Sequence, residues 1–63
     1  MSDKKTVEAV KDAVRRMGVQ ETARRLGIDE FSTLGIANGL IAKPKVYARC
    51  RVNLHLLVGG VQP

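Results

Sequence analysis

The sequence predicts an α+β fold: a three-helix domain that contains a helix-turn-helix, followed by a C-terminal β-strand that pairs between subunits. Two observations support this prediction. Residues 19–38 fit a helix, a tight turn and a second helix, because the small Ala23 permits close crossing and Gly27 permits the chain reversal. Residues 45–58 alternate apolar and polar side chains, which is the period of a half-buried strand.

The helical part is expected to span residues 4–39, and its first helix residues 4–17. Apolar side chains recur there at spacings of three and four. Ser2 or Asp3 can cap the start of this helix, and Gly18 can end it. The apolar stripe, which we expect to face the core, consists of Val7, Val10, Val14 and Met17.

The second and third helices are expected over residues 20–26 and between Asp29 and Gly39. Gly27 ends the second helix, and the apolar Ile28 fills the turn. Asp29 is a favourable N-cap for the third helix, and Gly39 is a favourable C-terminal breaker.

The C-terminal segment, residues 45–58, is expected to be a strand that serves dimerisation. Apolar residues occupy every second position, and Leu57 is the one exception to the alternation. The segment has no Gly, Pro or Asn-Gly pair that would form a hairpin, so the simplest partner is the same strand of a second copy, running antiparallel. The residues expected at this interface are Val46, Ala48, Cys50, Val52, Leu54 and Leu56.

A fourth helix is the alternative for the same segment, because some of its apolar residues are also spaced by four. These residues are Val46, Cys50, Leu54 and Val58. Such a helix would scatter the polar side chains and leave no clean polar face, which favours the strand. Pro44 can begin either element.

The chain of 63 residues is one small domain, residues 1–63, whose core is marginal on its own. Its single cysteine, Cys50, excludes an internal disulfide, and Cys50 with His55 provides too few ligands for a structural zinc site. We therefore expect stabilisation by a homodimer or higher homo-oligomer. No apolar run approaches the ~20 residues of a membrane span, and the N-terminus lacks a secretory signal, so a cytoplasmic protein is expected.

The net charge of +5, from eleven Lys and Arg against six acidic residues, favours an anionic partner, most often nucleic acid. Phe31 and Tyr47 are the two aromatic residues, which disfavours single-strand binding by base stacking. Cys50 lies on the apolar side of the expected strand, and His55 has no acidic or cysteine partner at a suitable spacing. Because the sequence indicates no catalytic set, metal site or cofactor site, the chain is not expected to be an enzyme.

The segment MGVQETARRLGI resembles the helix-turn-helix of Cro-type phage repressors. A glycine ends the first helix, a Thr-Ala pair lies in the second, and Leu-Gly-aliphatic makes the turn; the likeness covers about residues 7–39. The wider phage-repressor helix-turn-helix superfamily also fits, including IANG near the end of the third helix. Its all-helical members begin a fourth helix after a Lys-Pro pair, here Lys43-Pro44. The resemblance implies a homodimer that places two recognition helices in successive major grooves.

Under this resemblance, the base-reading positions of the third helix correspond to Glu30, Phe31, Leu34 and Gly35, with Asn38 near its end. A glutamate can accept from cytosine, and Phe or Leu can contact a thymine methyl group. An acidic, an aromatic and an aliphatic residue with a glycine are nevertheless an unusual set of side chains for reading bases. The alternative rotates the helix by one position, which turns Leu34 inward and exposes Ser32, Thr33, Gly35 and Asn38.

Cations and polar side chains around the two helices are candidate phosphate contacts. Gln20 and Thr22 lie at the start of the second helix, where helix capping explains them as well as phosphate binding does. Arg24 and Arg25 fit either phosphate clamps or a solvated face. Two lysines flank the start of the C-terminal segment. The candidate DNA-binding residues are Gln20, Thr22, Arg24, Arg25, Glu30, Ser32, Thr33, Asn38, Lys43 and Lys45.

The sequence thus predicts a sequence-specific, double-stranded DNA-binding transcriptional regulator. It would be a repressor that acts as a homodimer on an operator, nucleoid-associated when bound, with no small-molecule ligand. The alternative is a protein–protein interaction module, a small phage- or plasmid-encoded inhibitor in which Phe31, Leu34 and the strand dock another protein. A steep loss of duplex affinity with rising salt would favour the first interpretation.

Overall fold

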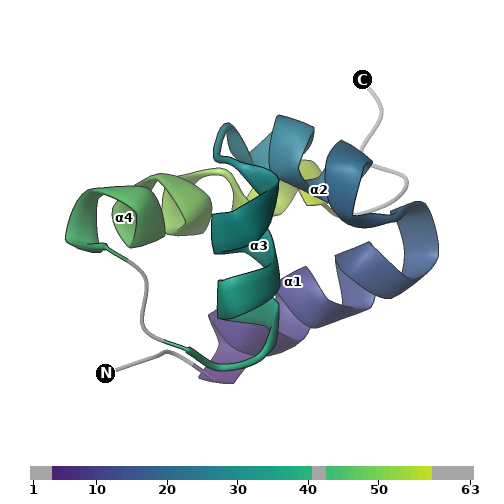
Figure 1. The fold of residues 1–63 in the computed structure, drawn as a ribbon, viewed down its shortest axis with the longest axis horizontal. Coiled ribbons are helices and arrows are strands. Elements are labelled where there is room, and N and C mark those ends of the chain that lie inside the picture. The colour runs from purple at the N-terminus through teal and green to yellow at the C-terminus, as the bar shows by residue number, and fades with distance from the viewer. Residues whose placement is uncertain (1–3, 41–42, 58–63) are drawn as a thin grey trace.

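The computed structural model describes residues 4–40 and 43–57, which form four α-helices and one short 3-10 helix (Figure 1). The elements are α1 (Lys4–Met17), α2 (Val19–Leu26), α3 (Glu30–Ala37), α4 (Pro44–Val52) and the 3-10 helix η1 (Leu54–Leu57). The first three helices pack against one another, and η1 packs on both α1 and α2. None of the described helices is long and apolar enough to cross a membrane.

The first three helices confirm the sequence prediction. On α1, Val10 and Ala13 are fully buried, so the apolar stripe faces the core. Gly18, with a φ of 90°, separates α1 from α2. The residues expected to cap α1, Ser2 and Asp3, lie outside the described residues.

The turn between α2 and α3 has the geometry that its sequence predicts. Gly27 adopts a left-handed conformation (φ 74°), and its N–H donates to the carbonyl of the buried Ala23 over 2.9 Å. Asp29 caps α3, because its carboxylate accepts from the N–H of Ser32 over 2.9 Å. These bonds fix the direction in which α3 leaves the turn.

The predicted C-terminal strand, and with it the α+β class, is wrong. Residues 45–57 are almost entirely helical, and the described part of the chain is all-α. α4 begins with Pro44 in its first turn, and after Asn53 the chain continues as η1. The fourth-helix alternative therefore fits this segment. Val58, the last position of the predicted strand, lies outside the described residues.

A helix suits this segment because it satisfies its own backbone hydrogen bonds, whereas a strand needs a neighbour. Cys50 of α4 and Leu57 of η1 lie in the core, where they are 0% and 2% exposed. Leu57 was the exception to the alternation, so its burial argues against a strand, which would place it on the polar face. The remaining residues of the predicted dimerisation face are dispersed, from half-buried to exposed: Val46, Leu54, Ala48, Val52 and Leu56.

Long-range hydrogen bonds attach the C-terminal segment to the first two helices. Arg16 donates to the Leu57 carbonyl over 3.0 Å. Arg25 donates to the Leu56 carbonyl over 3.2 Å. The side chain of Asn53 donates to the last carbonyl of α2 over 2.9 Å. The segment therefore completes the core of its own chain.

Candidate nucleic-acid interface

α3 has one face in the core and one face in solvent. Thr33 and Ile36 are fully buried, and the Thr33 hydroxyl donates to the Asp29 carbonyl over 2.8 Å. Phe31 and Leu34 lie on the outside instead, with exposed fractions of 86% and 43%. The helix therefore does not adopt the rotated arrangement in which Leu34 packs inward and Thr33 faces outward.

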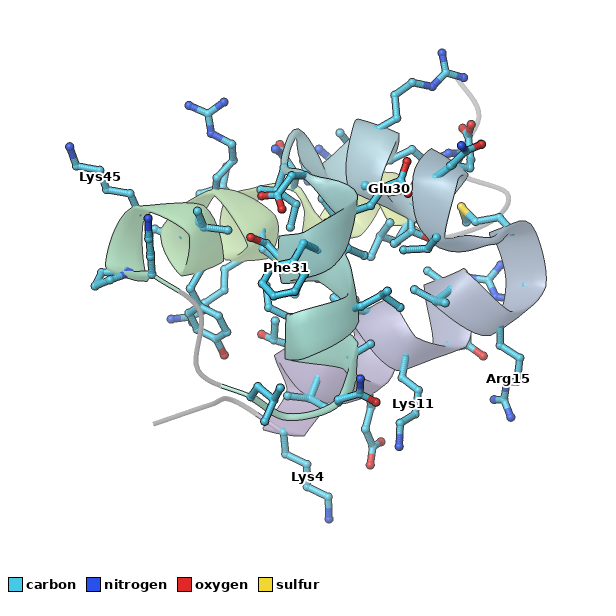
Figure 2. The ribbon with its side chains drawn as sticks, in the orientation of Figure 1. Lys4, Lys11, Arg15, Glu30, Phe31 and Lys45 are labelled. Carbon is cyan, nitrogen blue, oxygen red and sulfur yellow. The ribbon has the colours of Figure 1, made fainter. Side chains whose placement is uncertain are left out.

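A groove of about 600 Å³ lies between this outer face and the start of α4. Three exposed apolar residues along it, which we name the apolar ridge, are Phe31, Leu34 and Leu40. Figure 2 shows the Phe31 side chain on the outside of α3, in front of the ribbon in this view. The other lining residues of the groove are Asp29, Ser32, Gly35, Asn38, Lys43 and Val46.

Three cations border the apolar ridge and the α2–α3 turn, and we name them the basic rim: Lys43, Lys45 and Arg49. Lys45 and Arg49 line a smaller groove of about 360 Å³ beside Gly27. Arg49 lies close to the turn, since a Cβ on Gly27 would come within 3.4 Å of the Arg49 Cδ. Among the described residues, no side chain pairs with a rim cation by hydrogen bond or ion pair. The rim charges are therefore available to a ligand.

The arginines of α1 and α2 are placed differently, because each follows an acid by three or four residues. Arg16 pairs with Asp12 over 2.8 Å, and its hydrogen bond holds the pKa of Asp12 below its usual value. Arg25 pairs with Glu21 over 2.8 Å, which lowers the pKa of Glu21 in the same way. Arg15 also pairs with Asp12, over 3.4 Å, and Arg24 also pairs with Glu21, over 3.0 Å.

The other predicted contact residues differ in accessibility. Thr22 is buried, and its hydroxyl donates to the Gly18 carbonyl over 2.7 Å. Ser32 is half-buried, and its hydroxyl donates to the Asp29 carboxylate over 2.7 Å. Those hydroxyls are used within the fold. The exposed residues, which lie around α3 and the start of α2, are Gln20, Glu30 and Asn38.

No protein-family model matches this chain. Neither a curated protein nor a solved structure matches it. The candidate interface is therefore defined by its own side chains, namely the apolar ridge, the basic rim and the exposed polar residues beside them.

Arg49 is not among the DNA-binding residues predicted from the sequence, because the expected strand would place it on a face that is ordinarily solvated. In α4 it stands four residues after Lys45, so the two cations share one side of the helix. The distribution of acids is a second signal. All six acidic residues precede Phe31, so residues 31–63 contain four cations and no acid.

Cys50 and His55 lie in different surroundings. Burial raises the pKa of the Cys50 thiol to about 11, so the thiol is protonated at neutral pH. His55 is exposed on η1, with its Nδ1 3.1 Å from the Val52 carbonyl oxygen. Across the described ranges, no three His, Cys, Asp or Glu side chains gather in a way that would hold a metal ion.

Proposed function

We propose that the chain binds double-stranded DNA through the outer face of α3 and the basic rim, and acts as a sequence-specific transcriptional repressor. The charge distribution supports this most directly: residues 31–63 carry four cations and no acid, and three of these cations border α3 or the turn that leads into it. A helix flanked by positive charge suits the major groove, which admits one helix between two lines of phosphates. The resemblance of residues 7–39 to Cro-type phage repressors is consistent with this use of α3.

In this arrangement α3 enters the major groove and the basic rim contacts phosphates. Gln20, exposed in the first turn of α2, supplies an amide at a helix N-terminus, where phosphates are favoured. Arg24 is a weaker contact, because its charge is already shared with Glu21. The buried hydroxyls of Thr22 and Thr33 stay inside the domain and take no part.

Homodimerisation remains a prediction. The strand from which it was inferred is helical, and one copy of the chain is sufficient for the contacts described above. A dimer would bind two half-sites about one helical turn apart on the duplex. Sedimentation of the chain with and without a duplex would measure the number of copies bound.

Salt-dependent binding tests the proposal. The full chain is titrated into a fluorescent duplex of random sequence, and anisotropy gives the affinity at several salt concentrations. Each phosphate contact contributes about 0.9 to the slope of log affinity against log salt. We therefore expect the triple variant K43Q/K45Q/R49Q to lose about 2.7 from the slope of the unchanged chain.

Arg51→Gln is the matched control for the triple variant. Arg51 is exposed on α4, about 200° around the helix from Arg49, and it does not line the grooves beside α3. We expect the control to keep the slope of the unchanged chain. A chain that ignores duplex DNA at low salt would contradict the proposal, as would a triple variant whose slope equals that of the control.

A protein–protein interaction module is the second candidate function, and the exposure of Phe31 favours it. Contiguous apolar surface rimmed by polar residues is often a protein contact. Under this alternative, the unchanged chain would not bind duplexes even in dilute buffer, and Phe31→Ala would abolish its association with a protein.

A further inference from the structure

Packing within the chain does not account for the apolar ridge. α3 already contributes Thr33, Ile36 and Ala37 to the core. Phe31 and Leu34 lie on the opposite side, three residues apart and therefore neighbours on one face of the helix. Because Phe31 is 86% exposed, folding buries little of its surface and gains little from it. The ridge is therefore suited to contact with another molecule.

The charges around the ridge define the chemistry of that molecule. The basic rim is unpaired among the described residues, and it borders the same groove and the adjoining turn. A complementary partner is anionic at its edges and apolar where it meets Phe31. The major groove of DNA has both properties, because phosphates line it and the thymine C5-methyl group is the apolar feature of its base edges.

We infer that Phe31 and Leu34 recognise the C5-methyl groups of thymine, so that the duplex selected by this chain carries thymines opposite α3. This inference rests on the proposed function, DNA binding through α3. In this inference the apolar ridge selects among DNA sequences, and the basic rim provides the affinity that is common to all duplexes.

Two neighbours of the ridge, one on α3 and one at its C-cap, suit the same base pairs. Gly35 lines the groove, and a Cβ built there would meet nothing within 4 Å, so a base edge has space beside the helix. Asn38 is exposed seven residues after Phe31, which is about 10 Å along the helix. Its amide can bond to N6 and N7 of an adenine, the partner of thymine.

Removing the methyl groups from the DNA tests the inference without changing its charge. The first probe is an A·T-only duplex of mixed order and about 20 base pairs, two helical turns. The second is the same duplex with deoxyuridine in place of thymidine, which keeps the base pairing and the phosphates. We expect the unchanged chain to bind the thymidine duplex about fourfold more tightly per contacted methyl group, or about fifteenfold for two, with equal salt slopes.

The double variant F31A/L34A provides the protein side of the test. Both side chains are exposed, so we expect the variant to fold, which circular dichroism checks. Its preference for the thymidine duplex should fall to about onefold, while its salt slope stays that of the unchanged chain. Val52→Ala is the matched control, because Val52 is an apolar residue on α4 that is 71% exposed, and this control should keep the preference.

The results that would overturn the inference are distinct from those that would overturn DNA binding. Equal affinity of the unchanged chain for both duplexes, with a steep salt slope, rejects methyl recognition and leaves DNA binding standing. Equal loss of affinity for both duplexes in F31A/L34A also rejects it and makes the ridge a non-specific contact. Binding to neither duplex rejects both proposals, and self-association that F31A/L34A removes would assign the ridge to protein contact.

Discussion

Four arginines of α1 and α2 and two cations of α4 are similar side chains in two different situations. Arg16 and Arg25 each bind a carboxylate on their own helix and a carbonyl of η1. Lys45 and Arg49 have no such partner among the described residues, and they border the turn that leads into α3. No acid follows Glu30 in the sequence. For these arginines and the two α4 cations, a carboxylate three or four residues earlier on the same helix therefore separates the charges that hold the fold from those free for a ligand.

The largest effect on stability is expected from the paired arginines. Replacing Arg16 and Arg25 together by lysine keeps the charge but removes the guanidinium fork that reaches two acceptors. We expect the free energy of unfolding to fall by about 1–3 kcal/mol, because two charge-assisted bonds to η1 are lost from partly exposed side chains. Denaturation with urea measures this, and the salt slope of duplex binding should stay unchanged.

Arg15→Lys is the control for that double variant. The side chain of Arg15 is 78% exposed, and its ion pair within the described residues is with Asp12, at 3.4 Å. Its replacement should change the free energy of unfolding by less than about 0.5 kcal/mol. If the double variant were as stable as this control, the two arginines would not be attaching the C-terminal segment.

A smaller effect is expected at the junction between the two regions, where Gly27 lies against Arg49. An alanine at Gly27 must hold a left-handed conformation and place its Cβ 3.4 Å from the Arg49 Cδ, so we expect a loss of about 1–2 kcal/mol in unfolding free energy. Gly35→Ala is the counterpart inside α3, where nothing lies within 4 Å, and it should gain about 0.5–1 kcal/mol. Thermal denaturation ranks the two, and the opposite order would contradict the turn geometry.

Low pH should lower the stability of the fold through the carboxylates that pair with the arginines of α1 and α2. Asp12 and Glu21 have pKa values lowered by hydrogen bonds from Arg16 and Arg25. The stability that they contribute is present above their unfolded pKa values, about 4 to 4.5, and is lost as the pH falls through the lower folded values. Urea midpoints measured from pH 6 down to pH 3 should therefore decrease.

The double variant D12N/E21Q is the control for this pH dependence. It lacks both carboxylates, so its urea midpoint should fall less steeply with pH than that of the unchanged chain. Part of the dependence should remain, because hydrogen bonds from Ser32 lower the pKa of Asp29 as well. Equal slopes for the variant and the unchanged chain would exclude Asp12 and Glu21 as the cause.

The smallest effect concerns the acid at the start of α3. Glu30 is exposed beside the proposed DNA-binding face, so its carboxylate repels phosphates at low salt. We expect Glu30→Gln to bind a random duplex about two- to threefold more tightly, and the gain should disappear at high salt. Glu8→Gln makes the same change in net charge on α1 and should gain less; equal gains would place α3 no closer to the DNA than α1.

The helical part of the fold was predictable because its signals are local. Asp29 caps α3 through its own side chain, and Gly27 takes the one backbone conformation that favours glycine. The prediction for the C-terminal segment was wrong because residues spaced by four also fall on every second position. Both the helical and the strand pattern therefore fit the same residues. Leu57, which breaks the alternation and is buried seven residues after Cys50, was the position that distinguished them.

The candidate site was predictable only in part, because accessibility depends on contacts made elsewhere in the fold. Thr33 is polar but buried, since its hydroxyl bonds to a carbonyl one turn earlier. Phe31 is apolar but exposed: its hydropathy favours packing within the chain, whereas the family resemblance implies a base-reading position. Arg25 was predicted as a phosphate clamp, whereas the structure engages it with Glu21 and η1.

The bond between Arg16 and Leu57 joins positions that are forty-one residues apart. Contacts between positions so far apart in the sequence raise the contact order of the domain, because the chain loses the entropy of closing the intervening segment before they can form. We therefore expect Leu57 to join the core after α1 and α2 have paired.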